Sequence, residues 1–192
     1  MFYYVEALLS LLAIDLDRHF RQLVILYQQR LYSFALRLVG SPPDAEDIVQ
    51  EAFLRSYHAL NSYPVFRLRA LRIRPWLYTV TLNIFRNRQR KPEHQSIPLD
   101  TTGESPLLEI EDPSYGPDEE AYLHEMRREL EMELATLAER YRIAVTLYYF
   151  EDLSYAEIAE LLNQPIGTVK AHVHRALSQL HKALETQTNG VR

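Results

Sequence analysis

Apolar side chains recur at intervals of three and four residues over most of the chain, which is the spacing of an amphipathic helix. Residues 15–60 predict two helices, because a Gly-Ser-Pro-Pro break at 40–43 interrupts the pattern and Asp44 can cap a second helix that runs to about Leu60. The first helix keeps these apolar residues on one face: Phe20, Leu23, Val24, Tyr27, Leu31, Phe34, Ala35 and Leu38. No segment shows the convincing alternation of a strand, so the expected fold class is all-α.

Three more helices are predicted before the last part of the chain. A turn signal at 61–64 leads into an irregular basic stretch, and a helix is expected from Trp76 to about Arg90. A charged amphipathic helix follows at 118–137, and another at 140–150.

The segment between the helices predicted at 76–90 and 118–137 has the composition of a linker. Residues 92–117 hold five of the ten prolines and many acidic residues, so two small helical domains joined by an acidic, proline-rich linker are expected. The predicted parts are an apolar N-terminal extension at 1–14, an N-terminal domain at 15–91, the linker at 92–117, a C-terminal domain at 118–186 and a tail at 187–192.

The run from 153 to 184 predicts a helix-turn-helix. Ser154 and Glu157 form a capping box, Asn163 suits the positive φ of a turn, and Pro165 forbids continuation of the first helix. A second helix is expected to start at Gly167-Thr168, with an apolar face and an opposite polar face that would read DNA in the major groove. The polar face and its flanks comprise Thr168, Lys170, Ala171, His172, His174, Arg175, Ser178 and Gln179. An ordinary helical hairpin with a solvated face is the alternative for this segment alone.

The charge distribution favours nucleic-acid binding although the net charge of −5 does not. Pro64 to Pro92 contains eight basic residues and no acidic ones, whereas Glu93 to Glu125 contains ten acidic residues and no lysine or arginine. A local basic patch is what phosphate binding requires, so the first segment is the candidate DNA-binding surface.

The helix predicted at 44–60 has a second possible binding surface. Asp47, Gln50, Glu51 and Leu54 share its polar face, and a leucine surrounded by acidic and amide groups is typical of a docking surface. A capped amphipathic helix with a stray leucine is the alternative interpretation.

Aromatic residues interleave with the cations of the basic stretch. Aromatic rings stack on unpaired bases while arginines follow the phosphates, so the stretch suits single-stranded or melted DNA, with Asn83 available for a base edge. The candidate residues are Tyr63, Arg69, Arg72, Arg74, Trp76 and Asn83. The alternative is that Trp76 and its apolar neighbours belong to the core.

The sequence contains no motif that is typical of a catalytic or a metal-binding site. There are no cysteines, the seven histidines are scattered, and neither a phosphate loop nor a nucleophile motif is present. No cofactor, no metal and no enzymatic activity are therefore expected. Since the extension at 1–14 lacks a basic leader and is too short to span a membrane, it is interpreted as a first helix or an over-long start, and a cytoplasmic location is expected.

Several motifs resemble, in their order along the chain, those of the sigma factors of bacterial RNA polymerase. They are Asp44 to Phe53, Trp76-Leu77-Tyr78 with Asn83, Leu153-Ser154-Tyr155 and Gly167 to Lys170. With the acidic linker between them, the chain is similar to the two-domain extracytoplasmic-function class of the sigma-70 family.

The resemblance implies a promoter-specificity subunit that binds core RNA polymerase, recognises two promoter elements and melts the first. It would bind the clamp coiled coil of the polymerase through Asp47, Gln50, Glu51 and Leu54. It would read the minus-ten element through Tyr63, Arg69, Arg72, Arg74, Trp76 and Asn83. It would read the minus-thirty-five element through Thr168, Lys170, His172 and Arg175. The linker would thread the polymerase channel, and an anti-sigma protein is a possible further partner.

The chain departs from the family pattern in three places, one of which is Ala138, where the family often has proline. The loop between Tyr63 and Trp76 is several residues longer than the usual form, and Ala171 and His172 stand where the family often has serine and arginine. A dimeric helix-turn-helix regulator that binds duplex DNA without polymerase is the alternative function, but it leaves the basic aromatic stretch and the acidic linker unexplained.

Overall fold

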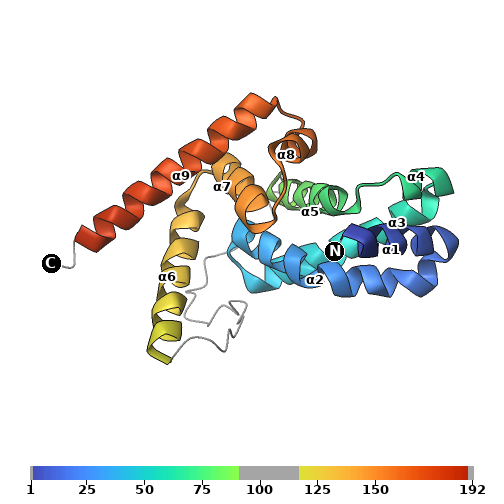
Figure 1. Ribbon diagram of the computed structural model, residues 1–192, viewed down its shortest axis with the longest axis horizontal. Coiled ribbons are helices and arrows are strands. Elements are labelled where there is room, and N and C mark those ends of the chain that lie inside the picture. Colours follow the sequence, from blue (N-terminus) through green and yellow to red (C-terminus); the bar gives the residue numbers. More distant parts are fainter. Residues whose placement is uncertain (1, 91–116, 190–192) are drawn as a thin grey trace.

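The computed structural model describes residues 2–90 and 117–189, and within them every regular element is helical, which confirms the all-α fold class (Figure 1). Apart from Pro117, the predicted linker lies outside the described residues, as does the end of the tail. The elements are α1 (Phe2–Ile14), α2 (Leu16–Val39), α3 (Pro42–Ser62), α4 (Val65–Arg69), α5 (Ile73–Arg90), α6 (Pro117–Thr136), α7 (Glu139–Val145), a π-helical turn η1 (Thr146–Phe150), α8 (Tyr155–Leu162) and α9 (Ile166–Asn189).

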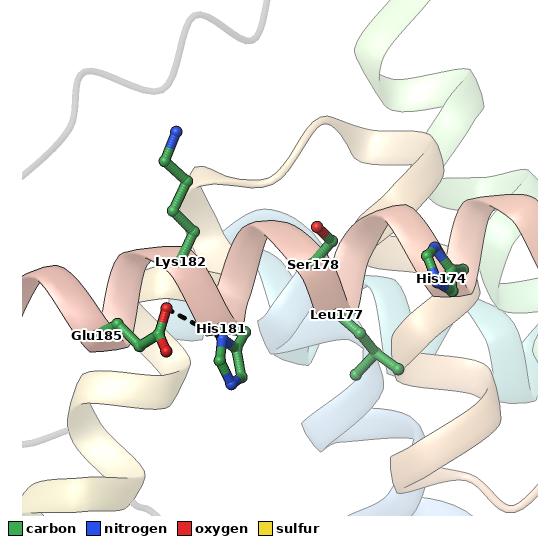
Figure 2. Close-up of a pocket in the computed structure, with 6 residues that line it drawn as sticks. All are labelled: His174, Leu177, Ser178, His181, Lys182 and Glu185. Atoms are coloured by element: carbon green, nitrogen blue, oxygen red, sulfur yellow. Dashed lines mark ion pairs between the residues drawn. The ribbon is translucent and has the colours of Figure 1, made fainter.

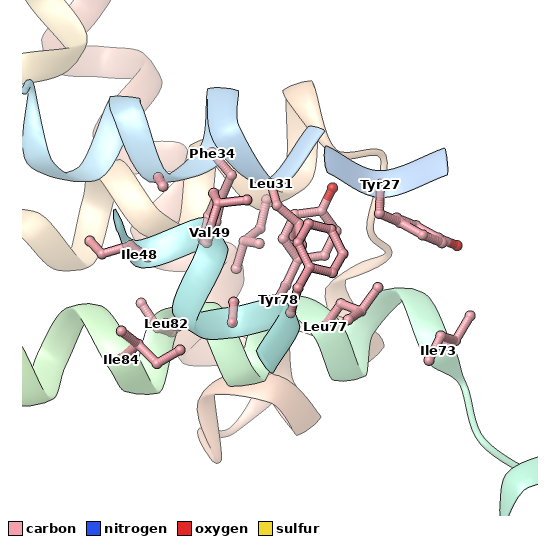
Figure 3. Close-up of a cluster of buried hydrophobic side chains, with 14 of the residues drawn as sticks. Tyr27, Leu31, Phe34, Ile48, Val49, Ile73, Leu77, Tyr78, Leu82 and Ile84 are labelled. Carbon is pink, nitrogen blue, oxygen red and sulfur yellow. The ribbon is translucent and has the colours of Figure 1, made fainter. Parts of the chain in front are cut away.

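Helices α2, α3 and α5 pack around the core of the N-terminal domain (Figure 3). Phe34 of α2 and Tyr78 of α5 are both fully buried, and their rings meet edge to face with centroids 5.1 Å apart. The apolar face predicted for α3 is buried as expected. Because large side chains from all three helices interlock here, the surfaces of α3 and α5 are held in a fixed relation.

Local signals explain the ends of α2 and the start of α3. Gly40 follows α2 with φ of 70°, a conformation that glycine adopts without a steric penalty, and its N–H donates to the Leu36 carbonyl at 2.7 Å. The prediction that Asp44 caps α3 was wrong, because the helix begins two residues earlier at Pro42, with Ser41 at the N-cap. Proline is favourable at the first helical position, because an N–H there would have no intrahelical acceptor.

Helix α1 packs against both α2 and α4. Its Leu8, Leu9 and Leu12 are buried in the same hydrophobic core as Leu68 of α4. The interpretation of the N-terminal extension as a first helix is therefore confirmed.

The predicted structure of the basic stretch needs two corrections. Residues that were expected to be irregular include the short helix α4, and α5 begins at Ile73, three residues before the predicted start at Trp76. Pro75, which was expected to end the irregular stretch, lies in the first turn of α5, where its missing N–H costs no helical hydrogen bond.

The helix-turn-helix forms as predicted, apart from the start of its second helix. Ser154 and Glu157 make both hydrogen bonds of the capping box, and Asn163 ends α8 in the left-handed conformation with φ of 52°. Helix α9 begins at Ile166, one residue before the predicted Gly167. A small separate core fixes α9 against α6 and α7, and it contains Leu134, Leu137, Tyr141, Val145, Ala176 and Leu180.

The two domains pack directly against each other, a contact that the sequence analysis did not predict. Figure 1 shows α8 beside α5, and the two helices are in contact. Apolar residues of the C-terminal domain share one continuous core with the N-terminal domain: Ile143, Leu147, Leu153, Ile158, Leu162 and Val169. The Arg142 side chain also donates to the Leu38 carbonyl at 3.2 Å, so polar and apolar contacts both join the domains.

Candidate nucleic-acid interface

The acidic surface of α3, formed by Asp47, Gln50, Glu51 and Leu54, lies opposite the buried face of that helix. Leu54 is 59% exposed, and the side chains of Asp47 and Gln50 are also exposed. A large apolar side chain that stays in water on a well-packed helix, surrounded by polar groups, is suited to docking. The four residues predicted to share a face are therefore brought together.

Arginines orient part of this acidic surface. Arg88 of α5 lies 3.2 Å from Glu51 and 3.7 Å from Asp47, while Arg55 pairs with Glu51 within the helix. Burial alone would raise the pKa of Glu51, but hydrogen bonds from Arg88 and Arg55 outweigh burial and leave its pKa below the ordinary value. Glu51 is thus held ionised and in place.

The aromatic residues of the basic stretch gather where α3 ends and α5 begins. Tyr63 and Trp76 meet edge to face with centroids 6.2 Å apart, and the Arg67 guanidinium lies 4.0 Å from the centre of the Tyr63 ring. Trp76 is half-buried against the core, so both interpretations of this residue hold in part. Phe66 on α4 is 77% exposed and offers an additional ring for stacking.

Sequence reasoning missed two residues at these surfaces. Phe66 is one of the aromatic residues that interleave with the cations, but its position on the short helix α4 was not predicted. Arg67 was counted only as a charge, and its stacking on Tyr63 depends on a helical turn that the sequence analysis placed in an irregular stretch.

Two arginines of the candidate minus-ten set contact the C-terminal domain. Arg72 pairs with Glu157 and lies 3.4 Å from Glu160, both on α8. Arg74 donates to the Glu151 carbonyl and lies 3.8 Å from the Asp152 carboxylate. By contrast, Arg69 and Asn83 are exposed, so the structure divides the predicted set between the domain contact and the open surface.

A buried carboxylate lies at the centre of this contact. Glu151 is 2% exposed and accepts a hydrogen bond from the hydroxyl of Tyr78, which is fully buried. Burial raises the pKa of Glu151 to about 7, although the Tyr78 hydrogen bond and nearby arginines oppose that rise. Burial also raises the pKa of Tyr78, so this phenol remains a hydrogen-bond donor at neutral pH.

The predicted reading residues of α9 differ in their exposure. Lys170 and Arg175 are exposed, whereas Thr168 and His172 are half-buried. The His172 ring packs edge to face on Tyr141 with centroids 5.4 Å apart. Burial and the neighbouring arginines keep the pKa of His172 below its ordinary value, so at neutral pH it carries no charge toward a phosphate.

Arg140 is a further cation at this surface, and the sequence analysis did not assign it to the site. Its guanidinium lies 4.8 Å from the centre of the Tyr141 ring, and Arg175 approaches the hydroxyl of the same ring at 3.4 Å. In the sequence, Arg140 was placed only at the start of the helix expected at 140–150. Spatial convergence of α7 and α9 therefore adds Arg140 to Lys170 and Arg175 as groups able to bind phosphate.

A shallow depression lies on α9 itself. Figure 2 shows its lining residues, all from this one helix, with His181 Nδ1 3.2 Å from Glu185. Since a single helix cannot enclose a ligand, this depression does not form a binding site. Among residues 2–90 and 117–189, no group of three or more histidine or acidic side chains is arranged to hold a metal ion, and no helix there is long and apolar enough to cross a membrane.

Comparison with known proteins agrees with the arrangement of these surfaces. The family model for Sigma-70 region 2 matches residues 23–94, and the family model for Sigma-70, region 4 matches residues 127–180. The ECF RNA polymerase sigma factor SigW of Bacillus subtilis is 32% identical over 169 residues, which cover 86% of this chain and 88% of SigW. The chain belongs to the extracytoplasmic-function sigma factors of the sigma-70 family.

Other relatives extend the comparison. The RNA polymerase sigma-H factor of Pseudomonas aeruginosa is 33% identical, with 88% of this chain and 87% of that protein covered. The ECF RNA polymerase sigma-E factor of Escherichia coli is 33% identical, with 83% of each chain covered. This sigma factor is thus a promoter-recognising subunit of RNA polymerase, and the region 2 match covers the stretch that a simple duplex-binding regulator leaves unexplained.

Two solved structures share the fold. CnrH in complex with the cytosolic domain of CnrY has a TM-score of 0.66 at 22% identity and covers 94% of this chain and 97% of CnrH. The sigma factor RpoE in complex with the anti-sigma factor NepR, from Bartonella quintana, has a TM-score of 0.66 at 23% identity, with 86% and 96% covered. Both support the all-helical, two-domain fold.

Proposed function

We propose that this sigma factor uses three separate surfaces in promoter recognition. The acidic surface of α3 binds the clamp coiled coil of core polymerase. The basic aromatic stretch binds the melted minus-ten element through Tyr63, Arg69, Arg72, Arg74, Trp76 and Asn83. Helix α9 binds the minus-thirty-five element through Thr168, Lys170, His172 and Arg175, assisted by Arg140.

The observation that carries the proposal is the chemistry of the aromatic cluster. Tyr63, Arg67 and Trp76 combine stacking faces and a cation within one patch, with Phe66 exposed beside it. Stacking surfaces next to arginines suit unpaired bases more than duplex DNA, whose bases are already stacked. A protein that only bound duplex DNA would have no use for this patch.

The proposal includes a non-enzymatic role, because each surface binds and none offers a nucleophile or general base in a cleft. The site of action is the cytoplasm, where polymerase and promoters are found together. An anti-sigma protein is proposed as a further partner, on the ground that the structure of RpoE that shares this fold contains one.

Run-off transcription tests the proposed function. Purified core polymerase is combined with a promoter library, with and without this protein. Start sites that appear only with the protein are expected, and they reveal both promoter elements at once. No new transcripts, together with specific duplex binding in the absence of polymerase, would contradict the proposal.

A further inference from the structure

Helix α4 carries part of the surface that the proposed function assigns to melted DNA. Phe66 is 77% exposed, and the Arg67 guanidinium lies 4.0 Å from the centre of the Tyr63 ring. Such rings and cations bind unpaired bases more tightly when they are already held in position, because a side chain that must be ordered on binding loses affinity. The support of α4 therefore affects how well this patch binds DNA.

The short helix α4 is not stable by itself. It spans five residues, Val65–Arg69, whereas isolated helices shorter than about 12–15 residues are marginal in water. Of its five side chains only Leu68 is buried, at 5% exposed. The position of α4 therefore depends on the packing of Leu68 against another element.

Helix α1 supplies that packing. Among the described helices α1 makes the main contact with α4, and it also packs against α2 (Figure 1). Leu68 is buried in the same core as three leucines of α1, which are Leu8, Leu9 and Leu12. Because successive residues of a helix are turned by about 100°, Phe66 lies about 200° around α4 from Leu68. Burial of Leu68 on the side of α1 therefore turns the Phe66 ring toward solvent.

We propose that α1 is a positioning element for promoter melting, which holds α4 so that Phe66 and the pair of Arg67 and Tyr63 are preorganised to stack on unpaired bases of the minus-ten element. This inference rests on the proposed function. The match to the Sigma-70 region 2 model begins at residue 23, so α1 lies outside the matched residues and α4 lies within them. The loop that contains α4 is longer than the usual form, and a longer loop has more conformations to restrict. A support from outside the matched region meets that need.

The other contact of α1 gives the alternative interpretation. Its packing against α2 would stabilise the N-terminal domain as a whole, without a particular effect on DNA. The two roles differ in what else changes when α1 is weakened. Positioning affects the stacking patch alone, whereas general stabilisation also affects the acidic surface of α3 that is proposed to bind core polymerase.

Two substitutions and their controls separate these roles in holoenzyme that is reconstituted from core polymerase and the full-length chain. Leu68→Ala removes the anchor of α4, and Leu12→Ala removes part of its support on α1. Leu11→Ala is the matched control, because Leu11 lies on the same helix but is 37% exposed. Leu12→Met is the conservative variant, since a volume-conserving swap in a core is tolerated.

Affinity is measured by fluorescence anisotropy with a labelled single-stranded oligonucleotide that carries the minus-ten element mapped by run-off transcription. Leu68→Ala and Leu12→Ala are expected to weaken binding about fivefold or more relative to Leu11→Ala, which is the lower end of what one stacked base contributes. Leu12→Met is expected to bind the oligonucleotide as the unmodified chain does. Core polymerase binding, measured by pull-down, is expected to be the same in all four variants.

A double-mutant cycle tests whether α1 acts through the Phe66 ring. Phe66→Ala truncates an exposed side chain, so it removes the ring without opening a cavity in the core. Leu12→Ala is expected to weaken oligonucleotide binding by a smaller factor in the Phe66→Ala chain than in the unmodified chain, because the ring that it would displace is already absent.

Three results would overturn the inference. They are oligonucleotide affinities equal to that of Leu11→Ala, a loss of core polymerase binding in the same proportion as the loss of oligonucleotide binding, and an equal effect of Leu12→Ala with and without the Phe66 ring. Transcription by the unmodified chain with core polymerase would leave the proposed function intact in each case. If the unmodified chain directs no transcripts at all, the proposed function itself fails.

Discussion

The packing of the C-terminal domain against the N-terminal domain, called closure below, is expected to depend on pH through Glu151. In the closed state this carboxyl has a pKa raised to about 7 by burial, and once the domains separate it returns to the ordinary value of 4.5 in water. The closed state therefore binds a proton more tightly than the open state. Protonation stabilises closure, so this contribution is fully present below about pH 4.5 and is lost as pH rises through about 7.

The two pKa values determine the magnitude. The gap between 4.5 and about 7 corresponds to about 3 kcal/mol over the whole range. From about pH 8 down to about pH 6, the gain is about 1.3 kcal/mol, or about tenfold in the ratio of closed to open chains. Glu151 is 2% exposed, so solvent screening reduces this value little.

Within the part of the chain that the structure describes, the groups that face Glu151 are three arginines and one tyrosine. Arg30 and Arg37 approach from α2, and Arg74 and Tyr78 approach from α5. Guanidinium groups stay charged throughout, and burial raises the pKa of Tyr78 well above neutrality. A change in closure between about pH 6 and pH 8 would thus report on Glu151 itself.

The assay is energy transfer between dyes on cysteines introduced at His58 of α3 and Ser178 of α9, recorded across the pH range; the chain has no cysteine of its own. Glu151→Gln is the control, because an amide keeps the volume and can still accept the Tyr78 hydrogen bond but does not titrate. The Glu151→Gln chain is expected to stay closed, with no pH dependence that comes from position 151. Equal pH profiles for the unmodified chain and Glu151→Gln would refute the reasoning, since other groups, such as histidines, would then cause the change.

Three further predictions concern the proposed interfaces. Replacing Arg69, Arg72 and Arg74 together with alanine is expected to impair promoter opening more than core polymerase binding, as measured by open-complex footprinting and polymerase pull-down. Arg175→Ala is expected to cost about 1–3 kcal/mol at the minus-thirty-five element if the arginine reads a base, measured by competition between promoter sequences. Leu54→Ala is expected to weaken core polymerase binding by about 1–2 kcal/mol, because an apolar anchor surrounded by polar groups is lost at a docking surface.

Matched control variants test whether these three effects are specific to the proposed surfaces. Ile25→Ala on α2 removes an aliphatic side chain that is 60% exposed, much as Leu54 is, but outside the acidic surface of α3. Arg128→Ala removes an exposed arginine of α6. Equal effects of Leu54→Ala and Ile25→Ala would reject the docking surface. Uniform weakening on all DNA sequences would make Arg175 a phosphate contact, and equal loss of opening and core binding would reject the triple-alanine prediction.

Local signals in the sequence predicted most of the helices because their causes are local. The capping box at Ser154 and Glu157 and the turn at Asn163 depend on residues within one or two turns of each other, and both are confirmed. The predicted start of α5 at Trp76 was wrong, because a proline such as Pro75 is compatible with two different positions relative to a helix. Proline excludes the interior of a helix but favours its first turn, and only the packing of Ile73 in the core decides between them.

The candidate site was predicted less completely, because its most informative contacts join residues far apart in sequence. The residue types of the basic stretch, together with the family resemblance, identified Arg72 and Arg74 as DNA-binding candidates, and the same chemistry lets them bind carboxylates. Which anion they meet in the free chain depends on how the domains pack, and no local pattern encodes that.

Glu151 shows how much the packing of the domains changes the environment that the sequence predicts for a residue. In the sequence it belongs to an acidic turn before the helix-turn-helix, where an exposed, ionised side chain is the ordinary expectation. In the structure Leu147 and Leu153 on either side of it are drawn into the shared core, so the carboxylate between them is carried inside with them. An acidic residue held in this position makes closure sensitive to protonation and to the Tyr78 hydroxyl. A leucine or alanine there would leave the same apolar contacts without the opposing cost, and the domains would then be harder to separate.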